Sequence, residues 1–181
     1  MILEWLDAQI DIVTVLWLFP ILFMFHDFEE ILTVEKWTKQ NKAQVFTLLP
    51  KSFHKYFASR FELTTLQFAK DVFWIYVAIT IATVLAVLFS FYYLLLMLLF
   101  IFFIHGFTHF AQAIYLKKYT PGVATSIILV LPYSVYAYYR LLQAGLISAG
   151  DIFWSSISIV ILSPALFLFL VNGRNRAMKR F

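Results

Sequence analysis

Long hydrophobic segments dominate the chain, and short polar segments separate them. Five of these segments are long enough to cross a bilayer as helices, at ~20 residues per crossing. They lie at about residues 12–34, 72–89, 91–116, 123–142 and 152–171. Because the hydrocarbon core of a membrane admits only helices and closed barrels, the pattern predicts an all-α fold, a polytopic membrane helix bundle with five transmembrane helices. No repeat or second domain is visible, so we interpret residues 1–181 as a single transmembrane domain.

The connections between these segments add two expectations. Ser90 separates the second and third segments almost without a loop, which predicts a tight antiparallel hairpin. Residues 35–70 form a long polar connection, which we interpret as a cytoplasmic or interfacial loop. Within it, residues 44–61 mix aromatic side chains with lysine and arginine, a composition typical of an interfacial amphipathic helix on the inner leaflet. A loop packed against the bundle is the alternative.

Composition supports the membrane class. Hydrophobic residues make up 62% of the chain and charged residues 13%, whereas soluble domains have roughly 45–50% apolar and about 25% charged residues. A soluble enzyme and a nucleic-acid-binding protein are therefore excluded. The chain has no cysteine, so a metal ion would have to be bound by nitrogen and oxygen ligands.

The distribution of charge predicts an orientation. With five crossings, every Lys and Arg except Arg140 falls on the side shared by residues 35–70, Lys117, Lys118 and the C-terminal tail. Because cytoplasmic segments carry the excess of cations, we expect the C-terminus in the cytoplasm and the N-terminus outside. Acidic rather than basic residues precede the first hydrophobic segment, so we expect no cleaved signal peptide.

Three ionisable residues interrupt the first segment. Its purely apolar part is too short to cross a bilayer at ~1.5 Å per residue, so the helix has to continue through His26, Glu29 and Glu30. Residues at positions i, i+3 and i+4 share one helix face, so these three side chains converge, while Asp27 points about 100° away. Ionisable residues inside a membrane are candidate functional residues.

A second polar stripe lies in the third segment. His105, His109 and Gln112 follow one another there at i, i+4 and i+7. The first and third segments run in the same direction, and their polar groups begin at a similar distance from the outer end. We therefore expect the two stripes to meet inside the bundle near the cytoplasmic leaflet, because exposing ionised groups to lipid is costly.

Together the two stripes form a ligand set for a divalent metal ion. Two imidazoles one helical turn apart can chelate one ion, and histidines combined with carboxylates are typical of zinc, non-haem iron and di-metal sites. We favour zinc over iron. A metal-free proton relay or acid/base site and a hydrogen-bonded network that fixes helix packing stay open as alternatives. The predicted metal ligands are His26, Glu29, Glu30, His105 and His109, and the further candidates for the site are Glu62, Asp71 and Gln112.

A turn follows the third segment at Tyr119-Thr120-Pro121-Gly122. Proline fixes φ and glycine supplies a positive φ, so Pro-Gly is typical of a rigid turn and requires no function. Because this turn closes the same end of the bundle as the two polar stripes, Tyr119 is a candidate hydrogen-bond donor and catalytic residue beside Glu29 and Glu30.

These elements resemble the family of bacterial membrane proteins named for its HXXEE motif. His26-Asp27-Phe28-Glu29-Glu30 matches that motif residue for residue, and Tyr119-Thr120-Pro121-Gly122 matches the family's YxPG element. The middle element of the family is similar to Asn-Ala-x-x-His. His109 matches it, whereas His105 and Gly106 depart from it, so a role for His105 rests on spacing alone. The resemblance implies the bacterial cytoplasmic membrane and adds site positions, but it implies no reaction.

Three functions are compatible with these residues. The first is an intramembrane metal-dependent hydrolase acting on a lipid or another membrane-embedded substrate, in which Glu29 or Glu30 is a ligand and the other carboxylate is the general base. If the metal were iron, the reaction would be oxidation of a lipid. The second is cation or proton transport or sensing, which would require a homo-oligomer because five helices without a repeat make a poor transporter. The third is a scaffold subunit with a structural polar network.

The expected partners follow from these hypotheses. They are membrane lipids and a lipid-like substrate, with no nucleic acid. A glutamic intramembrane protease of the CAAX-processing type is similar in its Glu-Glu pair, but Val34 and Ile101 depart from the pattern of that family.

Overall fold

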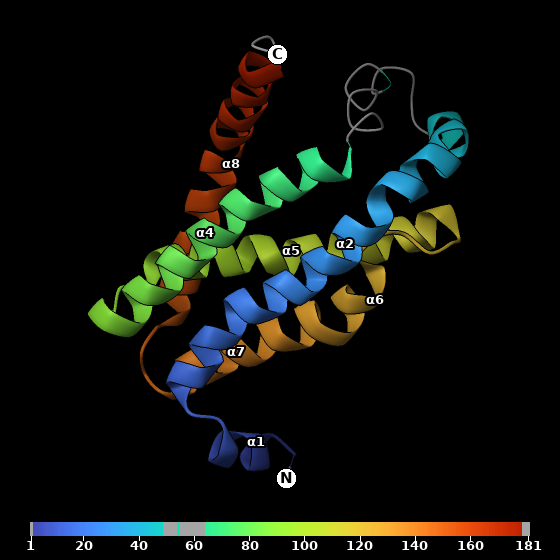
Figure 1. Ribbon diagram of the computed structural model, residues 1–181. Coiled ribbons are helices and arrows are strands. Elements are labelled where there is room, and N and C mark those ends of the chain that lie inside the picture. Colours follow the sequence, from blue (N-terminus) through green and yellow to red (C-terminus); the bar gives the residue numbers. More distant parts are fainter. Residues whose placement is uncertain (1, 49–53, 55–63, 179–181) are drawn as a thin grey trace.

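The computed structural model describes residues 2–48, 54 and 64–178, and every regular element in these ranges is helical (Figure 1). The predicted all-α fold is therefore confirmed for the described part of the chain. The elements are α1 (Ile2–Gln9), α2 (Ile12–Leu48), α4 (Thr65–Phe89), α5 (Tyr93–Leu116), α6 (Val123–Thr125), the π-helical turn η2 (Ser126–Val130), α7 (Leu131–Gln143) and α8 (Ala149–Met178).

Three of these helices, α2, α4 and α5, are long and apolar enough to cross a membrane. The fourth predicted segment is helical throughout residues 123–143, but η2 divides it, and α7 alone contributes only 13 residues of uninterrupted α-helix. In α8, the described side chains supply a shorter apolar stretch, Ala149–Pro164. Three of the described helices thus have the length and the hydropathy that a membrane crossing requires, which is typical of a membrane protein.

Helix α2 extends well beyond the predicted end of the first segment, as far as Leu48. Contacts with the end of α5 hold this extension: the Trp37 indole donates to the carbonyl of Tyr119 over 2.7 Å, and the Lys118 ammonium donates to the Asn41 side chain over 2.8 Å. The predicted loop at 35–70 is therefore shorter. The predicted amphipathic helix at 44–61 begins inside α2 and otherwise lies outside the described residues, apart from His54.

Helix α4 begins earlier than its apolar run because Thr64 caps it. The Thr64 hydroxyl accepts from the amide of Gln67, and the Gln67 side chain accepts from the amide of Thr64, which satisfies two backbone donors at the helix start. Glu35 of α2 accepts from both the amide and the hydroxyl of Thr65, over 2.6 and 2.7 Å. This carboxylate ties the start of α4 to α2. The predicted hairpin at Ser90 is confirmed, with Ser90 in the left-handed conformation between α4 and α5.

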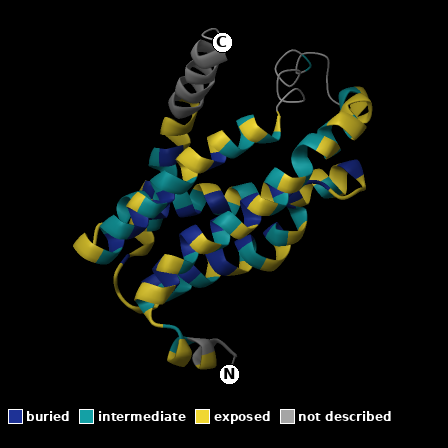
Figure 2. Cartoon of the chain, in the orientation of Figure 1, coloured by how far each residue is buried: buried dark blue, intermediate teal, exposed yellow. Residues whose placement is uncertain are grey.

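The core lies where α2, α4, α5 and α7 pack together, and the outward faces of the helices are exposed (Figure 2). Its largest buried residues include Phe19 of α2, Leu99 of α5 and Leu141 of α7. At Gly106, a Cβ atom would lie 3.0 Å from side-chain atoms of Val130 and Leu131. The small residue at this position therefore allows α5 to approach η2 and α7 closely.

Helix α1, which the hydrophobic pattern does not predict, is joined to the far end of α7 by a polar contact. The Asp7 carboxylate accepts from the hydroxyls of Tyr136 and Tyr139, over 3.2 and 3.1 Å, and from the guanidinium of Arg140 over 3.0 Å. Arg140 also donates to the Tyr136 hydroxyl over 2.9 Å. We call these four residues the Asp7 clasp.

Candidate metal centre

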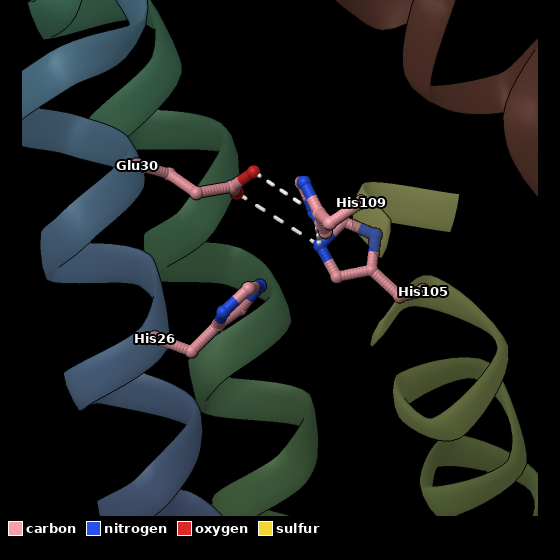
Figure 3. A group of neighbouring side chains, drawn as sticks. All are labelled: His26, Glu30, His105 and His109. Carbon is pink, nitrogen blue, oxygen red and sulfur yellow. Dashed lines mark hydrogen bonds and ion pairs between the residues drawn. The ribbon is translucent and has the colours of Figure 1, made fainter. Parts of the chain in front are cut away.

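Four potential metal ligands converge where α2 faces α5. They are His26 and Glu30 of α2 and His105 and His109 of α5, and one ligand atom from each lies within 4.8 Å of the others. Within each helix the two residues are four positions apart, so they project from one face. Figure 3 shows the two pairs pointing toward each other across the gap between the helices. We call these four residues the histidine cluster.

The separations within the histidine cluster are short. Glu30 Oε1 lies 3.1 Å from His109 Nε2, and Glu30 Oε2 lies 3.9 Å from His105 Nε2. The Nε2 atoms of His105 and His109 are 2.8 Å apart. His26, Glu30 and His109 are buried, whereas the side chain of His105 is 39% exposed. Only His105 therefore connects the cluster to the outer surface of the bundle.

The hydrogen bonds of Thr125 determine which nitrogen of His26 carries the proton. The Thr125 hydroxyl lies 2.6 Å from Glu29 Oε2 and 2.8 Å from His26 Nδ1. An ionised carboxylate only accepts hydrogen bonds, so the single hydroxyl proton goes to Glu29, and the hydroxyl oxygen accepts from His26 Nδ1–H. His26 Nε2 then carries a lone pair, and this buried atom has no hydrogen-bond partner among the described residues. A neutral imidazole with a free Nε2 is a ready metal ligand.

Glu29 is turned away from the histidine cluster toward the start of α6. Its carboxylate accepts from the amide and hydroxyl of Thr125, from the amide of Ala124 and from the Tyr119 hydroxyl, over 2.8, 2.6, 3.3 and 2.6 Å. These donors include two free backbone N–H groups at the start of a helix, where a negative charge is stabilised. Glu29 thus caps α6 and fixes Thr125, and the structure does not bring it among the grouped ligand atoms.

Tyr119 contacts the site through Glu29 and not through the histidine cluster. Burial and the hydrogen bond to Glu29 raise the pKa of the Tyr119 phenol above its usual value. The phenol therefore stays protonated at neutral pH and donates to the carboxylate. The backbone carbonyl of Tyr119 accepts from the Trp37 indole, so two residues of α2, Glu29 and Trp37, bind this turn.

Gly122 covers the histidine cluster directly. A Cβ atom at this position would lie 2.9 Å from Cε1 of His26, 3.0 Å from Cε1 of His109 and 3.1 Å from Cγ of Glu30. Its φ is +81°, a conformation that favours glycine. The predicted Pro-Gly turn is therefore present, and it also forms a close roof over three of the four candidate ligands.

The donor set of the histidine cluster could hold one metal ion. Four ligands at about 2.0–2.1 Å in a tetrahedron lie roughly 3.3 Å apart, and three pairs in the cluster are separated by 2.8, 3.1 and 3.9 Å. The full spread of 4.8 Å means that one side chain has to move by about 1 Å on binding. Three imidazoles and one carboxylate also supply more lone pairs than protons, which favours a shared cation.

The other candidate ligands from the sequence differ in their positions. Asp71 is exposed and is not among the grouped ligand atoms, and Gln112 is exposed. Glu62 lies outside the described residues. His54 is half-buried, and its ring meets that of Phe46 at a centroid distance of 4.9 Å. Asp27 is buried, and its Oδ2 has no hydrogen-bond partner among the described residues, yet it is not part of the cluster.

Sequence reasoning did not identify Thr125 and Gly122 as parts of the site. Thr125 lies about a hundred residues from His26, the group that it orients, and its position depends on the turn that folds α6 back toward α2. The turn motif itself was the available indication, because it closes the same end of the bundle. No spacing rule connects a residue after such a turn to a histidine in the first helix.

Comparison with known proteins assigns a family. A family described as "Protein of unknown function with HXXEE motif" matches residues 17–137, about two thirds of the chain. The chain belongs to this family. The matched range contains the whole histidine cluster together with Glu29, Tyr119, Gly122 and Thr125, and it ends before α8. No curated protein and no solved structure matches the chain.

The geometry gives the motif of the HXXEE family a physical meaning. Within His26-Asp27-Phe28-Glu29-Glu30, the histidine and the second glutamate face the candidate metal position. The first glutamate faces the turn and holds the threonine that orients the histidine. The two neighbouring carboxylates of the motif therefore have different partners.

Proposed function

We propose that the protein is an integral membrane metal-binding protein, and that His26, Glu30, His105 and His109 hold one divalent ion. The observation that carries this proposal is the convergence of four donor atoms from two helices, with His26 Nε2 buried and without a hydrogen-bond partner among residues 2–48, 54 and 64–178. The sequence analysis included Glu29 among the ligands. The four hydrogen bonds to Glu29 favour a supporting role for it instead.

We further propose that the chain crosses the bacterial cytoplasmic membrane five times, with the N-terminus outside and the C-terminus in the cytoplasm. The distribution of cations supports this topology. The metal centre then lies near the cytoplasmic leaflet.

Zinc is the ion that the proposal favours. Histidine-rich sites of four nitrogen and oxygen donors suit zinc, and a catalytic zinc site keeps one position for water. Iron in a two-histidine, one-carboxylate arrangement is the second choice, and it would make the reaction an oxidation.

The proposed reaction is hydrolysis of an ester or amide in a membrane-embedded substrate. A bound zinc ion lowers the pKa of a coordinated water and polarises a carbonyl group. For this reaction the three histidines would hold the ion and leave one position for water, and Glu30, beside His109, would leave the ion to accept a proton from the attacking water. As the bond from the carbonyl carbon to the leaving oxygen or nitrogen breaks, Glu30 returns that proton to the leaving group. The products are a carboxylic acid and an alcohol or amine, so atoms balance without a further reactant.

The metal proposal is tested by elemental analysis of detergent-purified protein. We expect about one zinc or iron ion per chain in the wild type and loss of that ion in His109→Ala. His54→Ala is the matched control, because His54 is the one histidine of the chain outside the cluster, and it should keep the ion. Wild-type protein that stays metal-free after reconstitution with zinc and with ferrous iron would overturn the proposal. Equal metal content in His109→Ala and wild type would overturn the choice of ligands.

A further inference from the structure

A groove on the surface of the bundle leads to the one exposed member of the histidine cluster. It lies between α5 and α8 and has a volume of about 290 Å³. Phe100, Ile101 and Ile104 line it from α5, and Ile159 and Val160 line it from α8. His105 lies in the same lining, so the groove reaches the candidate metal centre from the side and not through the roof that Gly122 forms.

The groove continues away from His105 and becomes more apolar. An adjoining hollow of about 310 Å³ shares Phe100 and Val160 with it and is otherwise lined by Phe153, Ser156, Ile157 and Ile161 of α8. From Ser163 to Phe153 the combined groove follows ten residues of α8, or ~15 Å at ~1.5 Å rise per residue. That length is about half of the ~30 Å hydrocarbon core of a bilayer, which corresponds to one leaflet.

In the first groove the polar side chains are those of His105, Thr108 and Ser163, and two of these are already occupied by hydrogen bonds. The Thr108 hydroxyl donates to the carbonyl of His105, and the Ser163 hydroxyl donates to the carbonyl of Val160. His105, one of the proposed metal ligands, is therefore the side chain that would bring the ion to this end of the groove. The groove thus presents a polar end at the metal centre and an apolar end about one leaflet away.

We propose that this groove binds the acyl chain of a membrane lipid from the leaflet on the metal-centre side, with the ester group of that chain at His105. The proposal rests on the proposed metal-dependent hydrolysis and names its substrate as an ester-linked acyl lipid. The match is one of polarity: an acyl chain is apolar along its length and carries its carbonyl at one end, as the groove is apolar along α8 and polar at His105. Lateral entry between α5 and α8 lets the lipid reach the ion without leaving the membrane.

The test uses the metal-loaded protein in nanodiscs that contain phosphatidylethanolamine with a photoreactive diazirine in one acyl chain. With the diazirine close to the ester, we expect cross-links at Ile104 and Thr108. With the diazirine at the end of the chain, we expect cross-links at Phe153 and Ile157. Labelling should saturate at about one lipid per chain. The reverse order of positions, or equal labelling of exposed residues on α4 such as Ile81, would overturn the proposal.

Two tryptophan variants separate the groove from the general lipid surface. Val160 lines both parts of the groove, so Val160→Trp should remove most of the cross-linking there while the metal content stays at the wild-type level. Ile128→Trp is the control, because Ile128 is 70% exposed on η2 and does not line the groove. Unchanged cross-linking in Val160→Trp overturns the proposal. Because metal content is measured separately, the experiment distinguishes a failure of the proposed lipid binding from a failure of the proposed metal binding. If a variant does not fold, the cross-link positions in the wild type still test the groove.

Discussion

The Asp7 clasp and the histidine cluster both place polar side chains in an apolar bundle, but only the clasp completes its own hydrogen bonds. In the clasp, the Asp7 carboxylate accepts from Tyr136, Tyr139 and Arg140, and a negative charge meets a positive one. In the cluster, three imidazoles surround one carboxylate, two Nε2 atoms lie 2.8 Å apart, and His26 Nε2 has no hydrogen-bond partner in the part of the chain that the structure describes.

This difference separates a structural contact from a ligand site. A buried polar group without a partner costs free energy, so native proteins satisfy nearly all such groups. The clasp satisfies its groups internally and needs nothing else to hold α1 to α7. The histidine cluster offers several lone pairs in one direction and could hold a cation. Variants that weaken each region should therefore have different signatures.

Removal of Glu30 should have the largest effect on metal binding. Glu30→Ala deletes the only carboxylate of the cluster, and we expect zinc affinity to fall by more than about 100-fold, beyond the effect of losing a supporting residue. Competition with a chromogenic zinc chelator measures this loss. The control is Asp27→Asn, which neutralises the neighbouring buried carboxyl outside the cluster and should keep wild-type affinity. A larger loss in Asp27→Asn than in Glu30→Ala would contradict the geometry.

Substitution of Thr125 should have the next largest effect, although Thr125 is no ligand. Thr125→Val keeps the shape of the side chain but removes the hydroxyl that accepts from His26 Nδ1. We expect zinc affinity to fall by about 10–100-fold, as is typical for partners of metal-bound histidines. Thr125→Ser restores the hydroxyl and should restore the affinity. The ¹⁵N chemical shifts of His26 in metal-free protein provide a second measurement, because the wild type should carry its proton on Nδ1 and Thr125→Val should show a mixture of tautomers. Equal behaviour of the valine and serine variants would mean that Thr125 only fills space.

A substitution in the Asp7 clasp should lower the stability of the protein and leave its zinc affinity unchanged. Asp7→Ala leaves Arg140 without its carboxylate, and we expect the free energy of unfolding to fall by about 1–3 kcal/mol, measured as a lower thermal unfolding temperature in detergent. Zinc affinity should stay within about twofold of the wild type, since substitutions at distant sites act independently. A loss of metal in this variant would show that the two regions are coupled through α7. The Asp7 clasp would then not be a purely structural contact.

Much of the fold and part of the site follow from the sequence. The hydrophobic segments predict an all-helical membrane protein, and helical spacing alone brings His26 onto the face of Glu30 and His105 onto the face of His109. Spacing could not separate Glu29 from Glu30, because i+3 and i+4 both lie near position i on a helix. The start of α6 separates them, since its free N–H groups attract one carboxylate and leave the other. Similarly, the extension of α2 to Leu48 depends on Trp37 and Asn41 meeting the end of α5, a long-range contact that no local pattern records.

Tyr119 should have the smallest effect of these residues. Tyr119→Phe removes one of the four hydrogen bonds to Glu29 and leaves the Thr125 and Ala124 donors in place. Because Tyr119 is half-exposed, water can replace the lost phenol, so the change should stay below about 1 kcal/mol, or about fivefold in zinc affinity. The pKa of the phenol is raised above its usual value, so the proton that it donates is kept up to and beyond about pH 10. The ratio of wild-type to Tyr119→Phe affinity should therefore stay constant between about pH 7 and 9. A loss approaching that of Glu30→Ala would instead make Tyr119 part of the metal centre itself.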